Sequence, residues 1–106
     1  MSEDAPVLID QITIHPSAYV FPNTFLAGAI SVGPESSVWP MSVLRADTVP
    51  IQIGAYSNVQ DGCIIHGDPG FPVIIGDWVT LGHGAIVHGA VLEDEVLIGI
   101  GAVILN

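Results

Sequence analysis

The sequence predicts an all-β protein folded as a parallel β-helix of about five coils. Three observations predict this fold. An aliphatic residue recurs every six positions, a small or hydroxyl-bearing residue often follows four positions later, and half of the 106 residues are hydrophobic while only 11% are charged. An α-helix would place apolar residues three and four apart, and a six-residue period does not match that spacing. A chain of this length fits one domain.

The aliphatic repeat sets the coils. Three six-residue sides make one coil of eighteen residues, and coils stacked at about 4.8 Å have the spacing of hydrogen-bonded strands. The chain therefore divides into a lead-in segment, residues 1–13, and a hexapeptide-repeat β-helix domain, residues 14–106. The repeat is occupied throughout by Ile, Leu or Val, at Ile14, Val20, Leu26, Val32, Val38, Leu44, Ile53, Val59, Ile65, Ile75, Leu81, Val87, Leu92, Ile98 and Ile104.

The second repeated position favours side chains that fit a tight corner. It is occupied by Ala18, Thr24, Ser36, Ser42, Thr48, Ser57, Cys63, Ala85 and Ala102. Membership in this set indicates that Cys63 is a small packed side chain rather than a catalytic thiol. Longer steps in the aliphatic repeat predict two protruding loops, at residues 49–52 and 67–72, and loops on a rigid scaffold are where functional sites are usually built.

Composition excludes several classes of partner. The net charge is -10, and Arg45 is the single basic side chain, which excludes binding of nucleic acid or of an anionic membrane through a basic face. One cysteine allows no internal disulfide. The acidic N-terminus lacks the basic region of a secretory signal, and the longest apolar run, residues 96–105, is half the length that spans a bilayer. We therefore expect a cytoplasmic protein.

Stacking of coils predicts neighbours that are distant in the sequence. On the third side of successive coils, the residues after the aliphatic position include Arg45, His66 and His88, so we expect these three to stack one coil apart. On the second side, Asp61 is expected to lie under His83, with Gln60 beside it. The register therefore gathers the polar residues into two columns on neighbouring sides.

The histidine columns suggest a metal site. Two imidazoles one coil apart can converge on one ion at about 2.0–2.1 Å from each nitrogen. His83 lies up to about 16 Å of extended chain away from His88, so we expect the three histidines to meet between subunits, as in a cyclic trimer, with a fourth position left for water. Alternatively, His66, His83 and His88 are outward-facing polar residues that hold no metal. His15, on the first coil, is expected to be a surface residue.

Several short motifs accompany these histidines. They are Arg45-Ala46-Asp47, Ile53-Gly54, residues 58–62, Ile65-His66, Ile75-Gly76-Asp77, Gly82-His83 and Val87-His88-Gly89. Together they resemble the signature of the γ-class carbonic anhydrases, which are left-handed hexapeptide-repeat proteins. The resemblance implies a left-handed β-helix and a homotrimer with zinc, or Fe²⁺ or Co²⁺, bound between subunits by His66, His83 and His88. It also implies that Arg45 and Asp47 form an ion pair bridging subunits, and that Gln60 and Asp61 orient the metal-bound water or hydroxide.

The activity that the resemblance implies is reversible hydration of carbon dioxide to bicarbonate by a metal-bound hydroxide, the reaction of a lyase. The loop at residues 67–72 offers only Asp68 as an acidic residue, and we expect it to be a turn residue. The archetypal enzyme carries acidic proton shuttles on a longer loop. Ala46 replaces the family's usual glycine, and the chain reaches Asn106 without the further coils and C-terminal helix that family members carry.

Two other functions stay open at this point. A metal-bearing subunit of a larger assembly would bind the ion without catalysing hydration. A hexapeptide acyltransferase would have to hold the phosphates of coenzyme A, which one arginine and no lysine make difficult.

Overall fold

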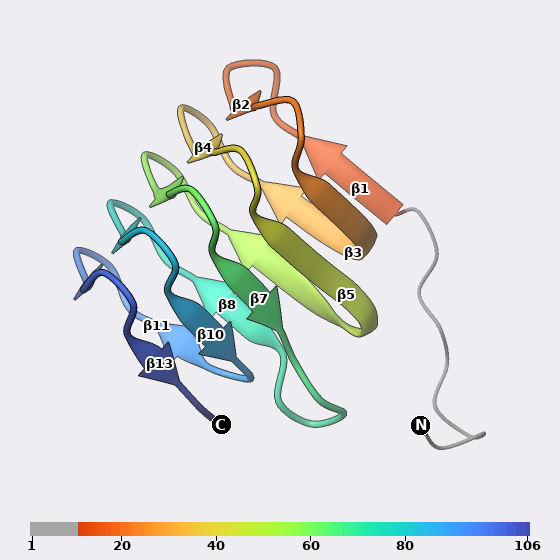
Figure 1. The fold of residues 1–106 in the computed structure, drawn as a ribbon. Helices are drawn as coiled ribbons and strands as arrows, with labels where there is room; N and C mark the ends of the chain where they lie inside the picture. The colour runs from red at the N-terminus through yellow and green to blue at the C-terminus, as the bar shows by residue number, and fades with distance from the viewer. Residues whose placement is uncertain (1–10) are drawn as a thin grey trace.

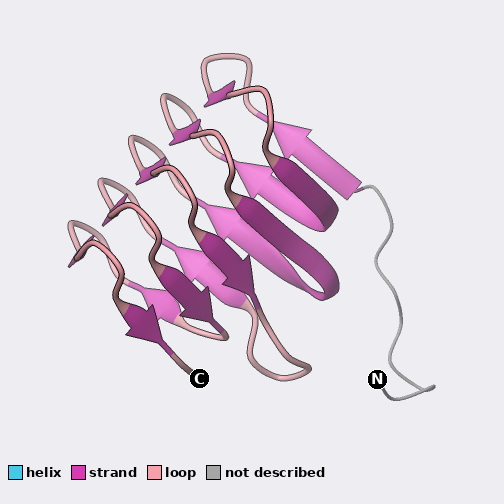
Figure 2. Ribbon diagram, viewed as in Figure 1, coloured by secondary structure: helices cyan, strands magenta, loops and turns pink. Residues whose placement is uncertain are grey.

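The computed structural model describes residues 11–106 as a three-sided prism of stacked coils, with strands and turns and no helix in that range (Figures 1 and 2). The lead-in segment predicted at residues 1–13 lies mostly outside the described residues, and the first strand begins at Gln11. Within residues 11–106, no helix has the length and apolar character needed to cross a bilayer.

Each face of the prism is a stack of parallel strands, one from each coil. One face is made by β1 (Gln11–Ile14), the second half of β3 (Phe25–Val32), the second half of β5 (Val43–Ile53), β8 (Val73–Ile75) and β11 (Val91–Leu92).

The second face consists of two-residue strands. They are β2 (Tyr19–Val20), β4 (Ser37–Val38), β6 (Asn58–Val59), β9 (Thr80–Leu81) and β12 (Leu97–Ile98).

The third face carries the site. It combines the first halves of β3 and β5 with β7 (Ile64–His66), β10 (Ile86–His88) and β13 (Val103–Ile104). Strands β3 and β5 each continue around a corner from the third face to the first face. The first and third faces therefore form one continuous sheet, and the second face is a separate sheet. The five predicted coils are confirmed.

The core is the column of aliphatic repeat residues that points into the prism. In the three middle coils every repeat position is at most 3% exposed, for example Leu44, Ile65 and Val87 at 0%. Exposure rises at the ends of the stack: Ile98 is 9% exposed, and Ile14 is 41% exposed because no other described coil packs against its outer side. The repeat positions are thus core residues wherever coils lie on both sides.

Small residues at the corners are buried because they bond to the next coil. The hydroxyl groups of Ser36, Ser42 and Ser57 donate to the carbonyl oxygens of Gly54, Gln60 and Gly76 at 2.6, 2.9 and 2.7 Å. The Cys63 thiol lies in the same kind of position, 3.2 Å from the carbonyl oxygen of Gly82. Burial raises the pKa of this thiol. The structural interpretation of Cys63 is therefore confirmed.

Removing one of these hydroxyl groups is expected to destabilise the stack. Ser57 also accepts a hydrogen bond from the buried backbone N–H of Val79 at 3.0 Å, so Ser57→Ala leaves a buried donor without its partner. We expect the free energy of unfolding to fall by about 1–3 kcal/mol, measured by urea denaturation followed by circular dichroism. Ser57→Cys reproduces the arrangement at Cys63 and should lose less; an equal loss in both variants would contradict this role for the hydroxyl.

The loop predicted at residues 49–52 is wrong, whereas the one at residues 67–72 is confirmed. Strand β5 continues to Ile53, and Ile51 is fully buried. The register with β3 shifts from Gly28↔Ala46 to Ile30↔Ile51, so residues 47–50 lie opposite the single residue Ala29 and are absorbed as a bulged corner. Residues 67–72 form a loop that extends from the prism between β7 and β8 (Figure 1).

Candidate metal centre

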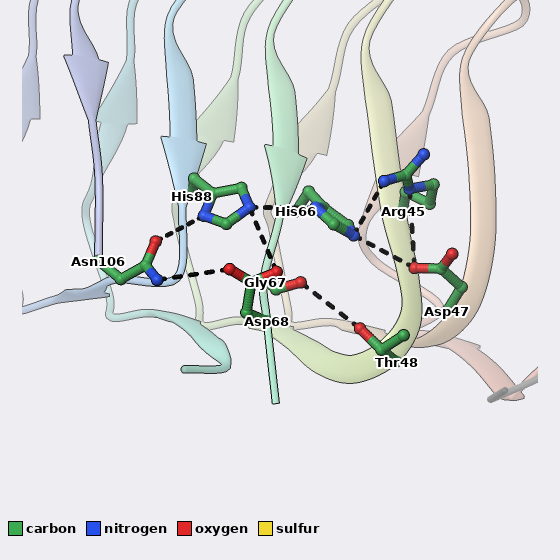
Figure 3. Close-up of polar contacts among 8 residues, drawn as sticks. All are labelled: Arg45, Asp47, Thr48, His66, Gly67, Asp68, His88 and Asn106. Atoms are coloured by element: carbon green, nitrogen blue, oxygen red, sulfur yellow. Dashed lines mark hydrogen bonds and ion pairs between the residues drawn. The ribbon is translucent and has the colours of Figure 1, made fainter. Parts of the chain in front are cut away.

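The site lies on the third face, where the first half of β5 reaches its corner and where β7 and β10 end. Strand pairing sets Arg45 beside His66, and His66 beside His88, one coil apart in each case. The stacking predicted from the six-residue period is therefore confirmed. The bulged corner that follows Arg45 brings Asp47 to the same place, and Figure 3 shows these side chains turned toward one another.

His66 is contacted at both ring nitrogens. Its Nε2 lies 3.1 Å from the Arg45 Nη2 group and 3.3 Å from Asp47 Oδ1, while its Nδ1 lies 3.2 Å from His88 Nε2. Arg45 and Asp47 form an ion pair within this one chain, with Nε and Oδ1 3.6 Å apart. Both side chains are partly exposed, so the pair itself contributes under about 1 kcal/mol to stability.

The protonation of His88 follows from its contacts with Asn106. A carboxylate oxygen can only accept, so the Asn106 amide nitrogen faces Asp68 Oδ2, at 3.5 Å. The Asn106 carbonyl oxygen then faces His88 Nδ1, at 2.6 Å, and Nδ1 must carry the proton that it donates. This leaves a lone pair on His88 Nε2, the nitrogen that points to His66.

The facing nitrogens of His66 and His88 have the separation that a tetrahedral ion requires. Two ligand atoms at 2.0–2.1 Å from such an ion are about 3.3–3.4 Å apart, and the observed distance is 3.2 Å. Without a cation, His66 Nδ1–H can donate to His88 Nε2 while Nε2 of His66 accepts from Arg45. With a cation, the His66 proton moves to Nε2, which then donates to Asp47 and no longer accepts from Arg45.

Asp47 is placed to accept a hydrogen bond from that N–H. Its Oδ1 atom is buried, and no group in the described part of the chain hydrogen-bonds to it, although it lies 3.3 Å from His66 Nε2. A buried carboxylate oxygen without a donor is unfavourable, and an N–H on His66 Nε2 supplies one. Metal-ligating histidines usually donate their second ring N–H to such a carboxylate or carbonyl. The two histidines and their neighbours therefore fit a divalent metal ion.

Asp68 joins the two histidines as a third candidate ligand. Potential ligand atoms of His66, Asp68 and His88 all lie within 4.8 Å of one another, and Asp68 Oδ1 is 3.8 Å from His88 Nε2. From the sequence we expect Asp68 only as a turn residue, and we expect no role for Asn106. Two features of the sequence could have placed these residues at the site. The Asp-Pro-Gly turn was the signal for Asp68, and the position one coil above Gly89 was the signal for Asn106.

The remaining candidate residues lie on the second side of the prism. His83 Nδ1 is 3.3 Å from Asp61 Oδ1, so the predicted stacking of Asp61 under His83 is confirmed. Both residues line a surface groove together with Gln60 and Trp39, and with Ser37 and Asn58. The structure thus brings Arg45, Asp47, His66 and His88 together on one side and Gln60, Asp61 and His83 together on another.

Similarity to known proteins decides the family. The chain is 51% identical over 79 residues to the "Probable carbonic anhydrase" of Methanocaldococcus jannaschii, covering 74% of this chain and 50% of that one. It is 43% identical over 91 residues to gamma carbonic anhydrase 3, mitochondrial, of Arabidopsis thaliana, covering 80% of this chain and 35% of that one. The chain belongs to the hexapeptide-repeat family of the γ-class carbonic anhydrases.

Solved structures resemble the present chain in fold. A hexapeptide transferase family protein from Anaplasma phagocytophilum superposes with a TM-score of 0.72 at 24% identity, over 90% of this chain and 70% of that one. This likeness agrees with the predicted left-handed β-helix. No family model matches the chain. The chain spans about half the length of the curated relative from Methanocaldococcus jannaschii.

In the present chain, Asn106 is expected to control metal affinity through its contact with His88. Asn106→Ala removes the acceptor of the Nδ1 proton, and loss of such a partner lowers metal affinity by about ten- to a hundredfold. The affinity is measured by competition with a chromophoric chelator. Asn106→Gln keeps both a carbonyl oxygen for Nδ1 and an amide nitrogen for Asp68, and should lose less affinity than Asn106→Ala. An Asn106→Ala protein that binds metal as tightly as the wild type would contradict this role.

Proposed function

We propose that this protein catalyses the reversible hydration of carbon dioxide to bicarbonate at a divalent metal, zinc in the first instance, with Fe²⁺ or Co²⁺ as alternatives. The proposed ligands are His66 and His88 of one chain and His83 of a neighbouring chain in a homotrimer. The observation that carries the proposal is the 3.2 Å separation of His66 Nδ1 and His88 Nε2, with an acceptor next to the other nitrogen of each ring.

The metal would supply one chemical function. Zinc with neutral ligands lowers the pKa of bound water to about 7, which makes hydroxide available near neutral pH. Hydroxide can attack the carbon of carbon dioxide and form bicarbonate. Because carbon dioxide is neutral, the net charge of -10 does not hinder its approach, and the same charge favours departure of the bicarbonate anion.

The chain's own residues have separate tasks in this proposal. Asp47 and Asn106 hold the ring protons of His66 and His88, so that a lone pair of each ring faces the metal. Arg45 provides the only guanidinium of the chain beside His66, where it can bind the anionic product. Gln60 and Asp61 share a groove with His83, and in a trimer they would enter the site together with that histidine and orient water.

Metal content, assembly and catalysis test the proposal together. Protein purified without chelator or nickel resin should contain about one metal ion per chain, sediment as a trimer, and accelerate carbon dioxide hydration in a stopped-flow assay with a pH indicator. A trimer that binds metal but does not accelerate hydration would instead be a metal-bearing assembly subunit. A protein without metal, whether monomer or trimer, would overturn the proposed site.

A further inference from the structure

Asp68 is held beside the two histidines by a specific turn. Residues 68–71 read Asp-Pro-Gly-Phe, and the N–H of Phe71 donates to the carbonyl oxygen of Asp68 at 2.7 Å. Gly70 has φ of 83°, which is the value of the third residue of a type II turn, and proline is favoured at the second. The turn therefore fixes the backbone of Asp68 and with it the direction of the Asp68 side chain.

The two oxygens of the Asp68 carboxylate have different neighbours. Oδ2 faces the amide nitrogen of Asn106 at 3.5 Å, and Oδ1 faces His88 Nε2 at 3.8 Å (Figure 3). Potential ligand atoms of Asp68, His88 and His66 all lie within 4.8 Å of one another, so a cation placed between them could be bound by all three residues. Asn106 thus orients both His88 and Asp68 toward the same point.

We propose that His66, His88 and Asp68 form a metal site that is complete within one chain and takes up the ion before His83 of a neighbouring chain reaches it. Two imidazoles and one carboxylate are an established ligand set for Zn²⁺ and for Fe²⁺. The carboxylate also neutralises one charge of the ion. This inference rests on the proposed function only for the role of His83 and for the class of metal.

Asp68 acts as a metal ligand only until the chains assemble and His83 of a neighbouring chain reaches the ion. The 3.8 Å distance from Asp68 Oδ1 to His88 Nε2 exceeds the about 3.3–3.4 Å between ligands of a tetrahedral ion, so the carboxylate moves inward when it binds. When His83 arrives, the ion has a third imidazole, and Asp68 can be displaced. Its carboxylate then leaves one coordination position for water.

The test uses the full-length His83→Ala protein, which cannot form the intersubunit site. Titration with Co²⁺, followed by its visible d–d absorption, should show one ion bound per chain. Adding Asp68→Asn should weaken Co²⁺ binding by at least about tenfold, whereas adding Glu93→Gln, which removes the same charge from an exposed position, should change it less than about twofold. Adding His66→Ala should abolish the absorption.

Two results would overturn the inference: His83→Ala protein that binds no Co²⁺, or an affinity that Asp68→Asn leaves unchanged. Neither result bears on hydration by the wild-type protein, which is measured separately. Conversely, a wild-type protein that binds metal but does not hydrate carbon dioxide would reject the proposed function, while the Co²⁺ titrations would still decide the role of Asp68.

Discussion

His66→Ala is expected to remove both the bound metal and the hydration activity. His66 is the central residue of the site, with Arg45 and Asp47 next to one ring nitrogen and His88 next to the other. No backbone hydrogen bond is lost, because alanine keeps the pairing of β7 with its neighbours. We expect metal affinity to fall by more than about a hundredfold, beyond the effect of losing a partner that only orients a ligand, and hydration to fall to the uncatalysed rate.

The control for this variant is His15→Ala. His15 is exposed on the first coil, and among residues 11–106 its one side-chain to side-chain hydrogen bond is to Ser17, so its loss removes an imidazole outside the site. Metal content by elemental analysis and hydration by stopped flow should equal the wild type. If His66→Ala retained its metal, or if His15→Ala lost it, the metal would have to be bound elsewhere.

The six-residue period predicted most of the fold because one steric requirement recurs in every coil. Each inward position must fill the same space, so Leu44, Ile65 and Val87 could be assigned to the core without coordinates. The corners were less predictable. Within residues 11–106, six residues other than glycine have positive φ, among them Met41, Tyr56 and Trp78 at 67°, 55° and 59°. Bulky side chains rarely adopt this conformation in isolation, and here the stacked coils impose it.

The site was predictable only as far as the six-residue repeat is regular. That repeat alone placed His66 beside His88, and Asp61 beside His83. Asp68 lies beyond the end of β7, and its direction depends on the turn that closes the loop. The sequence break after Leu44 has several solutions, and the register shift in β5 selects the one that brings Asp47 to His66.

Ile65→Ala is expected to have the largest effect on stability. Ile65 is fully buried and pairs in register with Leu44 below and Val87 above, so its side chain joins three coils. Removing it leaves a cavity that the stacked coils cannot close, since each neighbour is held by its own strand pairing. The free energy of unfolding should fall by about 2–5 kcal/mol, and by about 0.5–1.5 kcal/mol for Ile65→Val. Urea denaturation at a fixed chain concentration measures both.

Ile64→Ala separates the core from the strand. Ile64 precedes Ile65 in β7 but points outward and is 44% exposed, so the same truncation should cost less than about 1 kcal/mol. Because His66 follows Ile65 directly, a cavity at Ile65 should also loosen His66 and weaken metal binding, whereas Ile64→Ala should leave it unchanged. Equal losses of stability in the Ile64 and Ile65 variants would mean that the column of aliphatic residues is not what holds the coils together.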